Sequence, residues 1–77
     1  MNDNMWVVTA RVTDKAKSLN GEVSTGLGDW TRATFSTKAA AAEFDNWVTQ
    51  QTIAGRLISS QGVVHLEQEG GYLVRFK

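Results

Sequence analysis

The sequence predicts a small α+β domain: one antiparallel sheet of four to five strands, with one helix packed on one face. The first observation is a change of period. Residues 29–35 favour a strand, whereas residues 37–51 repeat their apolar side chains every three to four positions. The second observation is that alternation returns after Gly62. Strands should therefore flank the helix, in the order three strands, helix, two strands.

Length and composition limit what this chain can be. Its 77 residues are expected to form a single domain over residues 1–77, with residues 1–4 frayed. Three Trp, three Phe and one Tyr supply large side chains for a core. There is no Cys, which excludes disulfides, thiolate metal sites and cysteine nucleophiles.

Charge and targeting signals bear on partners and location. Eight Lys and Arg balance eight Asp and Glu, so the net charge of zero argues against strong nonspecific attraction to nucleic acid or membrane. A neutral chain also lacks self-repulsion, which leaves a homodimer open. Residues 1–5 have neither a basic region nor an apolar run, and no stretch approaches the roughly 20 apolar residues of a membrane helix. We therefore expect a cytoplasmic protein.

The first expected strand covers residues 5–13, because this segment is rich in β-branched side chains. Asn20 and Gly21 are then expected to form a type I′ hairpin turn into a second strand that begins with residues 22–25. A loop over residues 14–21 is the alternative. Alternation places four side chains of the first strand on its core face: Trp6, Val8, Ala10 and Val12.

The third expected strand, residues 30–35, follows a glycine-rich break at residues 26–29. Ala33 and Phe35 share one face of this strand, by period-two alternation. The opposite face carries three other side chains: Trp30, Arg32 and Thr34.

The expected helix is capped by the hydroxyl of Ser36 or Thr37 and runs to about Gln51. Gly55 is its expected stop. Five side chains form its apolar stripe: Ala40, Ala41, Phe44, Trp47 and Val48.

The last two strands form the clearest hairpin, with residues 63–69 and 72–77 joined by a turn at residues 69–71. Tyr72, Val74 and Phe76 share one face of the final strand, and Leu73, Arg75 and Lys77 share the other. Alternation does not say how this hairpin meets the earlier strands.

No group of residues points to catalysis. His65 is the only histidine, with Glu67 two positions on, whereas a stable metal site needs roughly four ligands and a triad needs a nucleophile. The glycines at 26 and 28 lack the spacing of a phosphate loop. We therefore expect no enzyme activity, no metal and no cofactor.

Trp30, Arg32 and Leu27 are the candidate contact group, since an exposed Trp beside Arg is typical of interface hot spots. The competing reading is that a bulge at Gly28 turns Trp30 inward. The expected function is a non-catalytic module that binds a protein. The alternative is a small single-stranded nucleic-acid-binding domain that uses Trp30, Tyr72 and the Arg and Lys side chains of an open sheet face.

The chain also resembles a known class of proteins in its build. Its length, its lack of Cys, its strand-helix-strand order and the helix Ser-Thr-Lys-Ala-Ala-Ala-Ala-Glu-Phe-Asp-Asn-Trp-Val are similar to small phage-encoded inhibitors of bacterial defence or host machinery, such as anti-CRISPR proteins. This resemblance covers the overall build and carries over no functional residue. It implies an inhibitor that binds and blocks a bacterial effector or nuclease complex. Such proteins usually have acidic surface, so the neutral charge argues against DNA mimicry.

Overall fold

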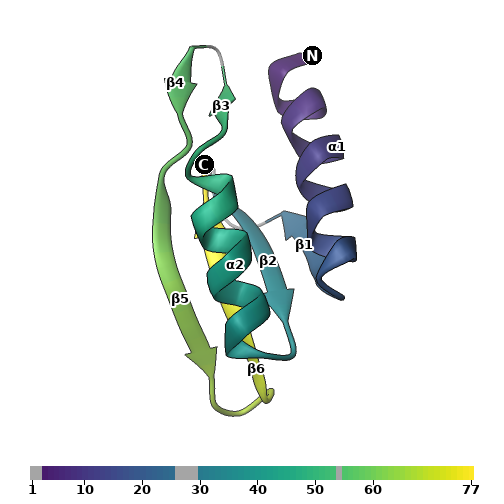
Figure 1. The fold of residues 1–77 in the computed structure, drawn as a ribbon, viewed down its shortest axis with the longest axis vertical. Coiled ribbons are helices and arrows are strands. Elements are labelled where there is room, and N and C mark those ends of the chain that lie inside the picture. The colour runs from purple at the N-terminus through teal and green to yellow at the C-terminus, as the bar shows by residue number, and fades with distance from the viewer. Residues whose placement is uncertain (1–2, 26–29, 54) are drawn as a thin grey trace.

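The computed structural model describes residues 3–25, 30–53 and 55–77. They form a small α+β domain with an antiparallel four-stranded sheet, as predicted. The strands of the sheet are β1 (Glu22–Thr25), β2 (Thr31–Phe35), β5 (Ser60–Leu66) and β6 (Gly71–Phe76). The other elements are helix α1 (Asp3–Ser18), helix α2 (Lys38–Val48) and a small hairpin of β3 (Thr52–Ile53) and β4 (Arg56–Leu57) (Figure 1).

The strand order is β1-β2-β6-β5, so the last strand, β6, lies between β2 and β5, which precede and follow α2 in the chain. Because β6 is antiparallel to both neighbours, β2 and β5 run in the same direction on either side of it. The pairing of β2 with β6 runs from Thr31 opposite Phe76 to Phe35 opposite Tyr72. This register decides which side chains of the two strands meet.

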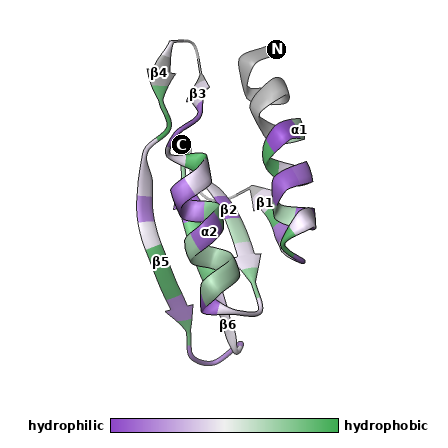
Figure 2. Cartoon of the chain, in the orientation of Figure 1, coloured by the Kyte–Doolittle hydropathy of each residue, from purple (hydrophilic) through white to green (hydrophobic). Residues whose placement is uncertain are grey.

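Both helices pack on the same face of the sheet. Figure 1 shows α2 in front of β6, between β5 and β2, with α1 alongside at the β1 end. Figure 2 shows both hydrophilic and hydrophobic residues on α2, and its buried residues, Ala41, Phe44 and Val48, recur every three to four positions. The buried core joins side chains from both helices and the central strands: Val12, Ala16, Ala33, Phe35, Ala41, Phe44, Val48, Ile58, Val74 and Phe76.

The predicted strand at residues 5–13 is wrong, because these residues lie within helix α1. The β-branched residues there favour a strand locally, but Val12 and Ala16 are four positions apart and both are buried against the core. In a strand, Ala10 and Asp14 would share the face of that pair, yet both are exposed, so the burial pattern fits a helix. The described residues therefore form two helices, and the order predicted for the elements is incorrect at the N-terminal end.

The sequence Asn20-Gly21 ends α1 and does not form the predicted hairpin turn. Asn20 has φ of 60°, and its N–H donates to the carbonyl of Lys17 (3.0 Å), while the Gly21 N–H donates to the carbonyl of Ala16 (2.7 Å). These two bonds are the pattern of a Schellman cap, which satisfies helix carbonyls that would otherwise lack a donor. The same dipeptide suits both turns because both need positive φ.

We expect Asn20→Ala to lower the free energy of unfolding by about 1 kcal/mol, because a Cβ without a polar side chain disfavours positive φ. Denaturant unfolding of the two proteins measures this difference. The control is Asn20→Gly, which should leave stability equal or higher. A loss of equal size in both variants would contradict the role given to the backbone conformation.

The second helix agrees closely with the prediction at its start and less well at its end. Thr37 is the N-cap, and its hydroxyl accepts from the Ala40 N–H at 3.2 Å. Ala41, Phe44 and Val48 are buried, while Ala40 and Trp47 pack partly buried against the core. The expected end near Gln51 and the stop at Gly55 are wrong. The helix ends at Val48, and the chain then forms the small β3–β4 hairpin, in which Gly55 has φ of 81°.

The predicted faces of β2 and β6 are confirmed. Ala33, Phe35, Val74 and Phe76 lie in the core, on the face that the helices cover. The return strand begins at Glu22 as expected, and β2 begins at Thr31. The end predicted to fray lies outside the described residues at positions 1–2, while Asp3 and Asn4 belong to α1. In the described part of the chain, neither helix combines the length and apolar character needed to cross a membrane.

Candidate binding face

The candidate site is the face of the sheet opposite the two helices, called here the open face. Since neighbouring side chains on a strand point to opposite faces, it carries the residues that alternate with the core positions. The cross-strand pairs on it are Glu22 with Thr34, Ser24 with Arg32, Arg32 with Arg75, and Leu73 with both Thr34 and Val64.

Trp30 lies at one end of the open face and is partly exposed. It does not belong to the hydrophobic core, and the bulge considered at Gly28 lies outside the described residues. The Lys77 ammonium nitrogen lies 4.7 Å from the centroid of the Trp30 ring. This is a cation–π contact, which places a positive charge directly on the aromatic surface.

Arg32 and Arg75 are directly opposite each other on β2 and β6. Like charges in this arrangement repel and destabilise a sheet. The Nε atom of Arg32 is buried and has no hydrogen-bond partner within the described residues. Lys77 lies two positions after Arg75, so the two side chains point to the same face, and the contact of Lys77 with Trp30 is on this face. Three cations and one Trp therefore gather in a single patch, called here the basic patch.

Leu73 forms an apolar centre next to the basic patch. It is only 1% exposed. Its direct cross-strand neighbours are Thr34 and Val64. Val64, on the edge strand β5, is 42% exposed. The open face thus combines the buried Leu73 and an exposed apolar edge with the neighbouring basic patch.

The structure brings two of the three predicted contact residues together. Trp30 directly precedes β2 and lies two positions before Arg32, and both side chains are on the open face. Leu27 lies outside the described residues. Tyr72, predicted to help stack nucleic-acid bases on the open face, lies on the covered face instead, where its ring stacks on His65 with centroids 4.8 Å apart.

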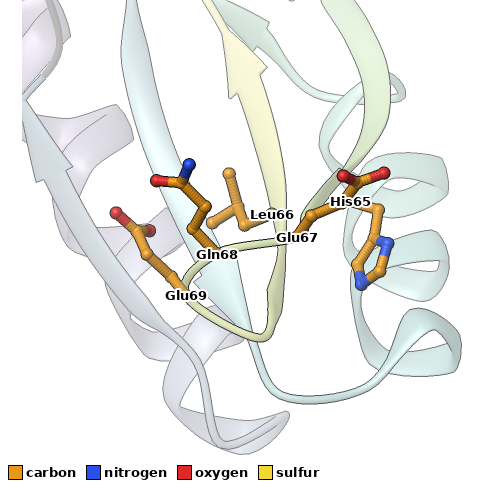
Figure 3. Close-up of a pocket in the computed structure, with 5 residues that line it drawn as sticks. All are labelled: His65, Leu66, Glu67, Gln68 and Glu69. Carbon is orange, nitrogen blue, oxygen red and sulfur yellow. The ribbon is translucent and has the colours of Figure 1, made fainter.

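A shallow hollow of about 350 Å³ lies at the β5–β6 turn. Figure 3 shows its lining residues, with His65 on the opposite side of the turn from Gln68 and Glu69. His65 is exposed, and within the described residues there is no cluster of three or more His, Asp or Glu placed to hold a metal ion. The hollow brings no nucleophile beside the imidazole, so its geometry gives no basis for assigning a reaction.

Sequence reasoning missed two members of the basic patch as neighbours of Trp30. Alternation placed Arg75 and Lys77 on one face of the last strand, but not beside β2. That neighbourhood comes from the insertion of β6 between β2 and β5. The available signal was one cation in β2, Arg32, and two at alternate positions of the last strand, and this signal has meaning only once the strands are known to pair.

Comparison of this chain with protein-family models, with curated proteins and with solved structures gives no match.

Proposed function

We propose that this protein is a non-catalytic binding module that binds a larger protein through its open sheet face. By the resemblance of its build to small phage-encoded inhibitors, the proposed partner is a bacterial effector or nuclease complex that the protein blocks. The observation that carries the proposal is the position of Trp30, which is partly exposed, outside the core and beside Arg32.

Trp and Arg are the side chains most enriched at the energetic centres of protein interfaces. Trp30 offers a large apolar surface with little rotamer freedom to lose, and the cations around it can bind polar groups of a partner. Trp30 and Arg32 are both partly buried, so their side chains lose less conformational entropy on binding than fully exposed side chains would.

We expect Trp30→Ala to weaken binding by about 2 kcal/mol or more, roughly a thirtyfold loss of affinity. The partner would first be captured from the native host with the tagged protein and identified by mass spectrometry. Isothermal titration calorimetry with the purified partner then measures the affinity of each variant. Trp30 lies outside the core, so thermal unfolding should show that the variant remains folded.

The matched control is Lys38→Ala, since Lys38 is exposed at the start of α2, on the helical side of the sheet. It should bind the partner like the parent protein. The interface assignment fails if Trp30→Ala unfolds the domain while other surface variants stay folded, or if its affinity matches that of the control.

A second candidate function is single-stranded nucleic-acid binding, which the clustering of three cations with Trp30 favours. The position of Tyr72 on the covered face leaves Trp30 as the described aromatic side chain available for stacking there. Titration with single-stranded DNA and RNA at several salt concentrations tests this candidate, because phosphate contacts make affinity fall steeply with salt. Absence of binding at low salt eliminates it.

A further inference from the structure

We infer that the open face binds an acidic protein segment, in which a Glu or Asp carboxylate contacts Arg32 and Arg75 and a neighbouring apolar side chain packs beside Val64. This inference rests on the proposed function and specifies the chemistry of the partner.

The charge arrangement is the first argument. Arg32 and Arg75 are directly opposite in the sheet, which places their Cβ atoms about 4.5–5.5 Å apart. The ion pair within the described residues joins Lys15 and Glu43 at 3.6 Å, away from this face. Glu22 borders the patch, diagonal to Arg32 on β1, and forms no ion pair with it. An incoming carboxylate would therefore relieve a repulsion that no ion pair among residues 3–25, 30–53 and 55–77 offsets.

Hydrogen-bonding geometry is the second argument. The Arg32 Nε–H is buried without an acceptor among the described residues, which is costly for a polar group. If the side chain turns toward a bound carboxylate, it gains a hydrogen bond at this atom without losing one. A guanidinium binds a carboxylate through two parallel N–H donors, and two opposed guanidinium groups can hold both carboxylate oxygens.

The apolar edge indicates the rest of the segment. Val64 is 42% exposed and lies in the cross-strand row of Leu73, the residue two positions before Arg75 on β6. A segment that crosses this face thus meets charge and apolar surface in succession. The expected occupant alternates acidic and apolar side chains. A patch of three cations suits such a segment better than a single-stranded nucleic acid, which needs a longer basic groove for its backbone and free aromatic surfaces for its bases.

A matched pair of synthetic peptides tests this inference: a hexapeptide of alternating Glu and Leu, and the same peptide with Gln in place of Glu. Each is titrated into ¹⁵N-labelled protein up to millimolar concentration and followed by amide chemical shifts. We expect the Glu peptide to shift the amides of residues 31–34, 63–66 and 73–77, and the Gln peptide to bind at least about tenfold more weakly, because charge-assisted bonds are lost.

The double variant Arg32→Gln, Arg75→Gln should lose the preference for the Glu peptide and remain folded. Removing the opposed charges should leave its melting temperature equal to or above that of the parent. If the two peptides bind the parent equally, or if the open-face amides do not shift at all, the inference is overturned. A melting temperature well below the parent value would overturn the repulsion argument.

Two further probes separate the sources of negative charge. Inorganic phosphate should shift the amides around Arg32 and Arg75 weakly and leave those near Val64 unchanged, whereas oligothymidylate should bind more weakly than the Glu peptide. Tighter binding of oligothymidylate overturns the inference in favour of nucleic acid. With the purified native partner, loss of binding by Trp30→Ala alone would sustain the proposed function and overturn the acidic-segment inference. Unchanged binding by Trp30→Ala and by the Arg32→Gln, Arg75→Gln variant would overturn both the proposed function and the acidic-segment inference.

Discussion

We expect Phe44→Ala to lower the free energy of unfolding by about 3–5 kcal/mol, the typical cost of removing a buried aromatic ring. Phe44 is fully buried, and its ring centroid lies 5.1 Å from that of Phe35, 5.6 Å from that of Phe76 and 6.0 Å from that of Trp47. It thus links α2 to the two central strands of the sheet. Truncation would leave a cavity where the covered face and the helix meet.

The consequence is large because the domain is small. At about 0.05–0.15 kcal/mol per residue, a chain of this length has a total stability of about 4–12 kcal/mol. Phe44→Ala should therefore remove a large share of the total stability, measured by circular dichroism and guanidinium titration. Phe44→Leu is the control, since it keeps much of the volume and should lose less. A loss below about 1 kcal/mol for the alanine variant would show that Phe44 is not the centre of the core.

The second large effect is expected at Gly21, where Gly21→Ala should cost about 1–3 kcal/mol through overpacking. A Cβ at this position would meet the Phe35 ring and would lie 2.9 Å from the carbonyl oxygen of Thr34, which belongs to the backbone of β2 and cannot easily move. Gly21 also donates the bond that closes the cap of α1. The cost should appear in denaturant unfolding as a lower midpoint with an unchanged slope.

A double-mutant cycle identifies the cause. Phe35→Leu removes part of the ring that the new methyl group meets, so the double variant should lose less stability than the sum of the two single losses. Strict additivity would mean that the cost comes from the Thr34 carbonyl oxygen and not from the Phe35 ring. Such a result would contradict the role given to the ring.

The predicted and observed structures agree best in the middle of the chain and at its end. The Thr37 cap, the apolar stripe around Phe44 and the alternating faces of β2 and β6 are local patterns. Such patterns predict the structure correctly where they agree with the packing of the core. The first element failed this test because its β-branched residues favour a strand, whereas the burial of Val12 and Ala16 by distant residues favours a helix. Propensity is a weak preference, and tertiary packing overrides it.

The candidate site shows the same division. Alternation along the chain by itself determined that Trp30 and Arg32 share one face of their strand, and that Arg75 and Lys77 share one face of theirs, because a strand's side-chain period is two. Only the tertiary structure decided that these faces join into one patch, since β6 must insert beside β2 for Arg75 to meet Arg32 and for Lys77 to reach Trp30. Strand pairing joins segments about forty residues apart, and the burial of Phe76 and Val74 beneath α2 selects the register.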